Sequence, residues 1–501
     1  MVILVRVNLI LALILAFMFR ALYTLYTGNP YYVDSWPLVA GASTFSSNPE
    51  ARIFDDVFYD GYNDRWPYSI IEAGLVVLVT GARAEDVCRL LGPTLGALAV
   101  LALYTLALRL SDERRASMAA LIAACSATLF AFEGGFTKEV YARPLVILAV
   151  LAVLYAWRLP LVTLLIMAVT LSHHVSSLAL LSILAGITVT ALVYELARGV
   201  LVVDVGRLLI AIAVTSASLV VHVLLVAPGF WRNAVSLGDI VLAIPFMVAS
   251  ASIAMFALLP SQRVTFKHRL VFSTVIALSA LAMSLIAMVT PPTPQTTPLG
   301  AYMALYATPL LLSPLFAYAT KASGAQAVVA GGWLIGMGAP MAYSAFSGNL
   351  AAAAAIQRFI NYTLYGVLIA YSTGPGKLVY AQAVLVLLTA PIVSFNILEL
   401  RDPYYHFNLY SESELTMVRL ASAKTPEVYG DSKIHYVAYR YKFLVEPPPL
   451  NIGELGKPLV VHRENLAKGF WVEGFIYGGN VGLLRFKFST VYDDGFNLIL
   501  R

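Results

Sequence analysis

The amino-terminal stretch VILVRVNLILALILAFMFRALYTLYTGNPYYVD, residues 2–34, determines the class of this protein. Residues 2–26 are almost entirely apolar, and a run of this length crosses a hydrocarbon core of about 30 Å as a helix. It exceeds the roughly 7–15 apolar residues of a signal peptide, and no A-x-A cleavage site follows it, so we expect it to remain as a membrane helix. A carboxylate, Asp34, comes a few residues after its end.

The composition of the whole chain agrees with this class. Of its 501 residues, 59% are hydrophobic and only 12% are charged, and the mean hydropathy is +0.78; a soluble protein carries about 25% charged residues. An ordinary soluble enzyme is therefore excluded. The net charge of +5 forms no basic tract, so no nucleic-acid partner is expected. Cys88 and Cys125 lie in apolar segments without the spacing of a metal site or a disulfide framework.

Twelve more apolar stretches predict an all-α polytopic membrane domain over residues 1–396, with about 13 transmembrane helices. These stretches are residues 87–110, 116–132, 144–158, 160–173, 175–197, 207–226, 240–259, 270–290, 300–320, 325–346, 357–372 and 377–396. Lys and Arg residues are concentrated in alternate connecting loops. The positive-inside rule therefore predicts a multi-pass protein of the plasma membrane, embedded in the lipid bilayer, with a cytoplasmic N-terminus and an external carboxy terminus.

Two regions are predicted to lie outside the membrane. Residues 27–86 should form one long external loop, and loops of this length usually carry function. Within it, residues 69–80 are apolar but extend only roughly 18 Å as a helix, so we expect a juxtamembrane helix at the membrane surface. After residue 396 the chain becomes more polar, since residues 397–501 hold 24 of the 61 charged residues. We therefore expect a soluble extracytoplasmic domain over residues 397–501.

This second domain is predicted to be a small α+β or mostly β domain. Its start, residues 412–423, has a helical pattern. Short strands separated by turn signals are predicted at residues 427–429, 434–441, 459–462, 481–489 and 496–500.

Asp34 is the first candidate for chemistry on the external face. A carboxylate near the lipid headgroups can accept a proton from an acceptor hydroxyl or bind a divalent cation. The alternative is that Asp34 only caps a helix that starts at Ser35.

The connection between the third and fourth predicted spans, residues 133–144, carries the second group of candidates. Lys138, Glu139 and Arg143 offer one carboxylate and two cations where a phosphate or a metal ion can dock. The alternative is that these charges only cap two helices in water.

Two further segments add candidates on the same face. His173 and His174, at the junction of the fifth and sixth spans, suit a divalent metal or a phosphate, or they only satisfy a tight turn. Adjacent helical residues point about 100° apart, so one of the two should face the site. Arg358 opens the twelfth span, where it can clamp a lipid phosphate or extend toward the membrane surface without a ligand.

The order of these features resembles the GT-C fold of membrane glycosyltransferases that use polyprenyl-phosphate sugars, among them protein O-mannosyltransferases, aminoarabinose transferases and oligosaccharyltransferase catalytic subunits. Residues 89–98, RLLGPTLGAL, followed by Tyr104, by Arg114-Arg115-Ala116 and by an Ala-rich helix ending at residues 130–136, resemble the second and third helices of the family. Residues 428–431, VYGD, and 491–495, VYDDG, are similar to carboxy-terminal domains of archaeal members.

The resemblance implies an enzyme that transfers one sugar, with inversion, from a polyprenyl or dolichyl phosphate donor to an external glycan, lipid or protein. It implies that Asp34 is the base or a metal ligand and that Glu139 is a second acid. The expected phosphate-binding residues are Lys138, Arg143, His173, His174 and Arg358. A divalent cation (Mn, Mg or Zn) would be held by Asp34, Glu139 and His174, but a DxD pair is missing at residues 137–139 and metal-free catalysis stays open. The WWDYG motif is also missing, which disfavours oligosaccharide transfer to asparagine.

Two other functions remain open: a membrane transporter, and a catalytically inactive GT-C-like scaffold that assembles surface polymers. Ionisable residues are nearly absent from mid-membrane depth, which disfavours the transporter. Arg20 is the main exception, and we expect it to extend toward the membrane surface from its position near a helix end.

Overall fold

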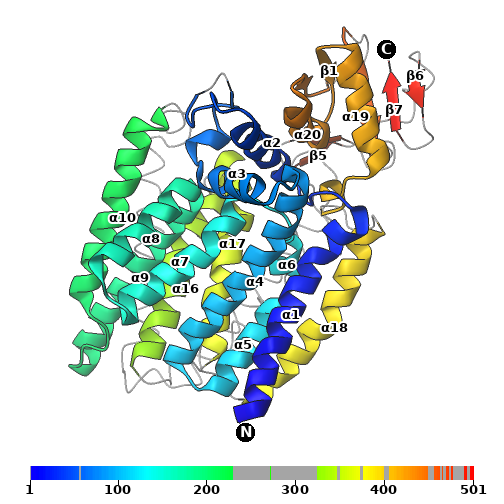
Figure 1. The fold of residues 1–501 in the computed structure, drawn as a ribbon. Coiled ribbons are helices and arrows are strands. Elements are labelled where there is room, and N and C mark those ends of the chain that lie inside the picture. The colour runs from blue at the N-terminus through cyan, green and yellow to red at the C-terminus, as the bar shows by residue number, and fades with distance from the viewer. Residues whose placement is uncertain are drawn as a thin grey trace.

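The computed structural model describes residues 2–55, 58–228, 271, 324–346, 350–372, 376–399, 405–448, 456–462, 465, 470–472, 475–477, 490–493 and 497–500. Its main body is a bundle of long helices (Figure 1). In chain order the helices of this part are α1 (Val2–Thr27), α2 (Ser35–Ser47), η1 (Asn63–Arg65), α3 (Tyr68–Thr80), α4 (Ala84–Leu110), α5 (Glu113–Cys125), α6 (Ala127–Glu133), α7 (Lys138–Tyr155), α8 (Leu159–Ser172), α9 (His174–Arg198), α10 (Val205–Leu225), α16 (Ala325–Phe346), α17 (Leu350–Tyr371) and α18 (Gly376–Leu398).

A helix is present at each predicted span that falls within the described residues; the predictions at 240–259, 270–290 and 300–320 lie outside them. By length and composition, four helices of the described part are able to cross a membrane: Asn8–Thr27, Ala84–Leu110, His174–Arg198 and Val205–Leu225. The single span predicted at 116–132 is broken, because α5 and α6 meet at an angle of 59°. Counting that pair as one span gives five.

The surface of the bundle is apolar, as a lipid environment requires. On α1, Ile14 and Met18 are half or more exposed, and on α10 the same is true of Leu224 and Leu225. The opposite side of α1 is buried through small residues such as Ala16. Helices that are hydrophobic all round are typical of membrane proteins, so these faces identify the bundle as a membrane domain.

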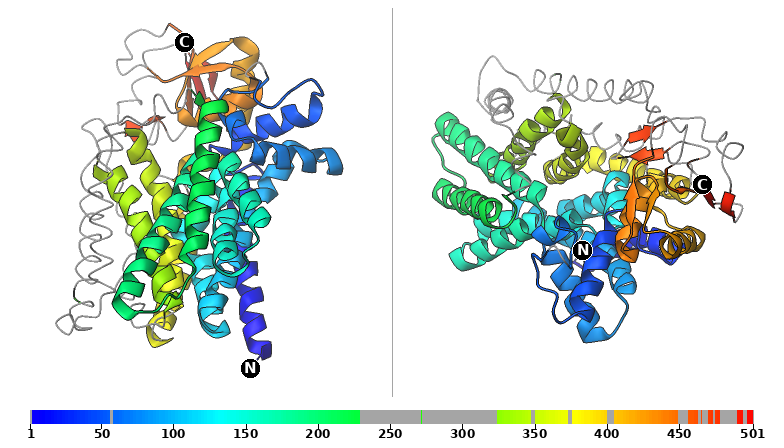
Figure 2. Two further views of the ribbon diagram at one scale, coloured as in Figure 1. Left: turned by 90° about the vertical axis from the view of Figure 1, so that its left-hand side faces the viewer. Right: turned by 90° about the horizontal axis from the view of Figure 1, so that it is seen from above.

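One end of the bundle carries α2, α3 and the carboxy-terminal region, and the N-terminus lies at the opposite end (Figures 1 and 2). α3 confirms that residues 69–80 are helical. α2 starts at Ser35, where the alternative interpretation of Asp34 placed the start of a helix, although its Gly, Ser and Thr residues are weak helix formers. Burial of Trp36, Leu38 and Val39 stabilises it.

The carboxy-terminal region, residues 405–500, mixes helices and strands. After η3 (Tyr405–Asn408) come the helices α19 (Glu412–Lys424) and α20 (Ser432–Tyr441). The strands β1 (Glu427–Tyr429), β2 (Leu444–Glu446), β3 (Leu459–His462), β6 (Thr490–Asp493) and β7 (Asn497–Leu500) form a sheet in the order β2-β1-β3-β7-β6, and β4 (Phe470–Val472) pairs with β5 (Phe475–Tyr477). β1 is parallel to β2 and β3, whereas β3, β7 and β6 are antiparallel.

The secondary structure of this region corrects one prediction. The helix at 412–423 and the strands at 427–429 and 459–462 are confirmed, and the last predicted strand is present as β7. The strand predicted at 434–441 is wrong, because these residues belong to α20. Asp431 caps this helix by accepting a hydrogen bond from the Ile434 amide at 3.2 Å. The strand predicted at 481–489 lies outside the described residues.

Candidate active site

A buried glutamate joins three helices near the end of the bundle that carries the carboxy-terminal region. Glu133, the last residue of α6, has no solvent exposure. Its Oε2 accepts from Arg20 Nε at 2.8 Å, and its Oε1 accepts from Arg143 Nη1 at 2.5 Å and from the Tyr365 hydroxyl at 2.6 Å. Arg143 Nη2 donates in turn to Glu139 Oε1 at 2.6 Å. Each buried charge here therefore has a partner of opposite sign.

These ion pairs continue from Glu139 through Arg358 to a partly exposed aspartate, Asp34. Arg358 Nε lies 3.5 Å from Glu139 Oε2, and Arg358 Nη2 lies 3.7 Å from Asp34 Oδ2. The side chains of Arg358 and Asp34 are each 29% exposed, whereas Glu139 is buried. We call the six residues the ion-pair chain; in order they are Arg20, Glu133, Arg143, Glu139, Arg358 and Asp34. Positive and negative charges alternate along it, and only its last two members reach solvent.

A glycine on α4, Gly96, leaves space for Arg20 at the inner end of the ion-pair chain. A Cβ on Gly96 of α4 would lie 2.4 Å from Arg20 Cδ, so only glycine at this position leaves space for the arginine. Arg20 is completely buried and paired with Glu133. The expectation that it extends toward the membrane surface is therefore wrong. A guanidinium in an apolar bundle requires such a partner, because an unpaired buried charge is costly.

The backbone around Asp34 is held by the carboxy-terminal region. Tyr32 has a φ of 77°, which is unusual for a residue with a side chain. The Tyr32 amide donates to the Asn408 carbonyl at 3.0 Å, and the Val33 amide donates to Asn408 Oδ1 at 3.2 Å. Asp34 stands at the N-cap position of α2, yet its side chain makes no capping hydrogen bond. The carboxylate is thereby directed to Arg358 instead of to the helix.

The connection between α6 and α7 packs directly on this segment. A Cβ on Gly135 would lie 2.3 Å from Tyr32 Cβ. Only a glycine allows the two backbones to approach so closely. This contact brings the start of α7, with Lys138 and Glu139, to the same place as Asp34.

Lys138 is a buried cation next to the ion-pair chain. Its Nζ lies 3.9 Å from the centre of the Tyr62 ring and 5.1 Å from that of Trp66, and it has no hydrogen-bond partner in the described part of the chain. Lys138 precedes the predicted membrane-spanning part of α7. Burial lowers the pKa of Lys138 to about 7, although the nearby charges of Asp60 and Asp34 act in the opposite direction.

The two adjacent histidines have different surroundings. His173 Nδ1 lies 3.0 Å from Ser176 Oγ, which accepts from the Tyr362 hydroxyl at 2.7 Å. His173 is thus held within the first turn of α9. The His174 ring packs 4.8 Å from the Trp66 ring, and Trp66 also contacts Lys138. Of the two histidines, His174 is therefore the one that shares a neighbour, Trp66, with Lys138.

The structure corrects three predictions about the placement of these residues. Arg143 is fully buried between Glu133 and Glu139, so it is not placed to bind the donor phosphate. Arg358 lies in the third turn of α17 instead of at its start, and it points toward Asp34 and Glu139, not into lipid.

The third correction concerns the metal ion. No group of three His, Cys, Asp or Glu side chains within the described residues is arranged to hold one. Arg358 lies between Asp34 and Glu139, where a shared cation was expected. The set Asp34, Glu139 and His174 therefore does not fit a common metal ion.

Comparisons with known proteins give structural neighbours only. No protein-family model and no curated protein matches the chain. Among solved structures it aligns with ArnT from Cupriavidus metallidurans in the apo state, with 12% identity, a TM-score of 0.40, and coverage of 99% of this chain and 97% of that chain. The same protein bound to undecaprenyl phosphate gives 11% identity, a TM-score of 0.39 and the same coverage. At these values the likeness says nothing of activity, and the function proposed below rests on the site itself.

Proposed function

We propose that this protein is a membrane glycosyltransferase of the GT-C type, which moves a sugar from a polyprenyl-phosphate-linked donor to an external acceptor. The proposal rests on the arrangement of Arg358 and Asp34 at the outer end of the ion-pair chain. A half-buried carboxylate, Asp34, lies beside a half-buried guanidinium, Arg358, at the end of an apolar bundle. A phosphodiester at this depth requires cations that offset its desolvation, and Arg358 and Lys138 provide them.

The reaction needs one proton acceptor and one stabilised leaving group. Asp34 takes the proton from the acceptor hydroxyl, whose oxygen forms a bond to the anomeric carbon of the donor. The bond between that carbon and the phosphate oxygen breaks on the opposite face, which inverts the configuration. The electron pair stays on the polyprenyl phosphate, where Arg358 and Lys138 stabilise the additional negative charge. Glu139, held by Arg143, keeps the Arg358 guanidinium in place.

A transfer assay tests this function directly. The full chain in lipid nanodiscs would be incubated with polyprenyl-phosphate sugars that are radiolabelled in the sugar, and the release of the labelled sugar from the polyprenyl lipid would be measured. We expect release with at least one donor, faster when an acceptor is added. Donor binding without release would indicate a scaffold, and passage of an intact donor or sugar across a sealed membrane would indicate a transporter; both results contradict a transferase.

We also propose the orientation that the loop charges predict: a cytoplasmic N-terminus, about 13 spans and an external carboxy-terminal region. The two chain ends lie at opposite ends of the bundle (Figure 1), which suits this arrangement. In vesicles that expose the external face, added protease is expected to cleave the carboxy-terminal region. Protection of that region, with cleavage only after the vesicles are opened, would reverse the orientation.

Replacing Arg358 tests the phosphate site. A charge-assisted contact to phosphate is worth on the order of 1.5–3 kcal/mol, so Arg358→Ala should raise the Kd for the donor roughly tenfold to a hundredfold. Binding of a non-hydrolysable donor analogue to the protein in nanodiscs would measure this. Arg207→Ala, which removes an exposed arginine paired with Asp204, is the matched control and should leave the Kd unchanged. An equal effect of both replacements would remove Arg358 from phosphate binding.

Lys138 should make donor binding depend on pH. Because the pKa of Lys138 in the free protein is about 7, its Nζ is charged below that pH and the Kd for a phosphodiester should stay constant there. Above it the amine must regain a proton on binding, so the Kd should rise by up to tenfold per pH unit. Lys138→Arg, which stays charged, should remove this dependence. A wild-type Kd that is constant from about pH 6 to 9 would show that binding does not use the charge of Lys138.

A further inference from the structure

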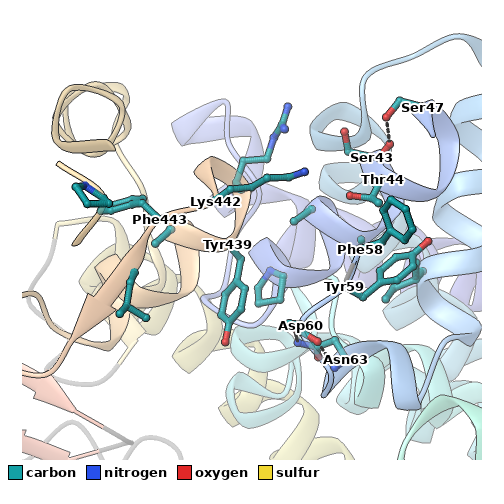
Figure 3. Close-up of a pocket in the computed structure, with 18 residues that line it drawn as sticks. Ser43, Thr44, Ser47, Phe58, Tyr59, Asp60, Asn63, Tyr439, Lys442 and Phe443 are labelled. Atoms are coloured by element: carbon teal, nitrogen blue, oxygen red, sulfur yellow. Dashed lines mark hydrogen bonds between the residues drawn. The ribbon is translucent and has the colours of Figure 1, made fainter. Parts of the chain in front are cut away.

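A cavity of about 710 Å³ lies between the external loop and the carboxy-terminal region. α2 forms one wall, residues 58–63 a second, and the end of α20 with the start of β2 a third (Figure 3). A cavity of this size accommodates a small organic ligand. It is separate from the ion-pair chain, none of whose members lines it.

The lining combines hydroxyl groups with aromatic rings. Ser43, Thr44 and Ser47 present hydroxyls from α2. Tyr59 and Tyr439 stand on two sides of the cavity, with Asp60 and Asn63 between them (Figure 3). Hydroxyls, amides and carboxylates exchange hydrogen bonds with the hydroxyls of a sugar, and an aromatic ring offers a flat apolar surface to the C–H groups on one face of a pyranose. This combination suits a saccharide.

The neighbouring sheet edge does not suit an extended peptide. β2 is the edge strand of its sheet, and Leu444 lines the cavity. The backbone groups of Leu444 and Glu446 bond toward β1, through Leu444 N to Pro426 O at 3.0 Å and Gly430 N to Glu446 O at 2.9 Å. The Val445 carbonyl, on the other side, lies 2.9 Å from His435 Nδ1. Strand addition needs a row of open backbone groups, and the His435 side chain of α20 contacts the outward-facing carbonyl of Val445.

The cavity is aligned with the proposed catalytic aspartate. Pro37, Gly41 and Thr44 all line it and lie three or four residues apart on α2, so they form one face of that helix. Asp34 immediately precedes the same helix. At the other wall, the Tyr62 amide donates to Asp60 Oδ1 at 2.9 Å, and the Tyr62 ring contacts Lys138. A chain of sugars lying along α2 would thus have one end directed to Asp34.

We propose that this cavity binds the acceptor and that the acceptor is a saccharide, held between Tyr59 and Tyr439 with its terminal hydroxyl toward Asp34. The role as acceptor rests on the proposed function; saccharide binding itself requires no turnover. Tyr439 is 37% exposed and its ring contacts His435 in an edge-on arrangement, so part of the ring is available for stacking.

Binding of short oligosaccharides to the full chain in nanodiscs tests this inference. The probes are maltotriose, chitotriose and a galacturonic acid trisaccharide, with serine-containing octapeptides as the peptide comparison. We expect at least one saccharide to bind, and Tyr439→Ala to raise its Kd by roughly tenfold. Tyr439→Phe, which keeps the ring, should bind nearly as the wild type does. Tyr441→Ala, on the same helix but outside this cavity, is the matched control and should have little effect.

The outcomes separate this inference from the proposed function. Saccharide binding that is weakened in Tyr439→Ala but kept in Asp34→Asn supports the cavity whether or not transfer is found. Binding of no saccharide, or an equal Kd for wild type and Tyr439→Ala, overturns the cavity as a saccharide site even if donor cleavage is observed. Binding of the octapeptides in place of the saccharides also overturns it and identifies a peptide acceptor.

Discussion

Replacing Asp34 with asparagine is expected to lower the rate of sugar transfer by about 10²–10⁴-fold, the usual contribution of a general base. The amide keeps the size of the side chain but cannot accept the proton of the acceptor hydroxyl. The Kd for the donor should stay within a few-fold of the wild-type value or fall slightly. The replacement removes a negative charge that lies 3.7 Å from Arg358, and that charge repels the donor phosphate.

The two readouts must be measured on the same preparation. Transfer rates would come from the radiolabel assay, and the Kd from binding of the donor analogue, since a lower rate with an unchanged Kd identifies a group that acts in the transition state. Glu50→Gln provides a matched control, because Glu50 is an exposed carboxylate just beyond the end of α2. Wild-type turnover in Asp34→Asn would exclude Asp34 as the base, and a large rise in the Kd would assign it to donor binding instead.

Glu133→Gln is expected to produce the largest loss of stability. The amide cannot neutralise Arg20 and Arg143, which are both fully buried, and leaving a buried charge without its partner costs about 3–5 kcal/mol. The hydrogen bond from the Tyr365 hydroxyl does not offset such a loss. The free energy of unfolding would be measured by titration with SDS in mixed micelles.

A partly exposed ion pair supplies the comparison for Glu133. Glu85 lies 2.8 Å from Arg440, and both side chains are partly exposed. Glu85→Gln should therefore lower the free energy of unfolding by about 1 kcal/mol or less. If the two replacements have the same effect, the buried pairs at Glu133 do not stabilise the bundle beyond an ordinary surface pair.

Asp34, Glu139 and Arg358 could be selected from the sequence because each is a charge beside a long apolar run. Such charges are rare in membrane segments and usually functional. Their mutual contacts could not be derived. Arg358 is far from the other two in the chain, and the contact depends on how α17 packs against α7 and the segment before α2. For the same reason the sequence did not show that the Arg358 guanidinium lies between Asp34 and Glu139, two of the three expected metal ligands.

Glu133, Arg20 and Asn408 were missed as parts of the site. Glu133 and Arg20 are 113 residues apart, and each resembles an isolated charge at a helix end until the helices are packed. The sequence around Asn408 does not indicate its role, because Asn408 only accepts hydrogen bonds from two backbone amides, those of Tyr32 and Val33. Gly135 can be read from the sequence, but the Tyr32 backbone that it approaches cannot.

By itself the sequence determined that this is a membrane protein, and it located the long helices within the part of the chain that the structure describes. A hydrocarbon core admits only apolar runs of sufficient length, and that requirement is readable residue by residue. The tertiary structure alone decided which charges pair, that 434–441 forms a helix, and that α2, residues 58–63 and the end of α20 together line a cavity. Those outcomes depend on burial and on contacts between distant segments, which a local pattern of apolar and polar residues does not contain.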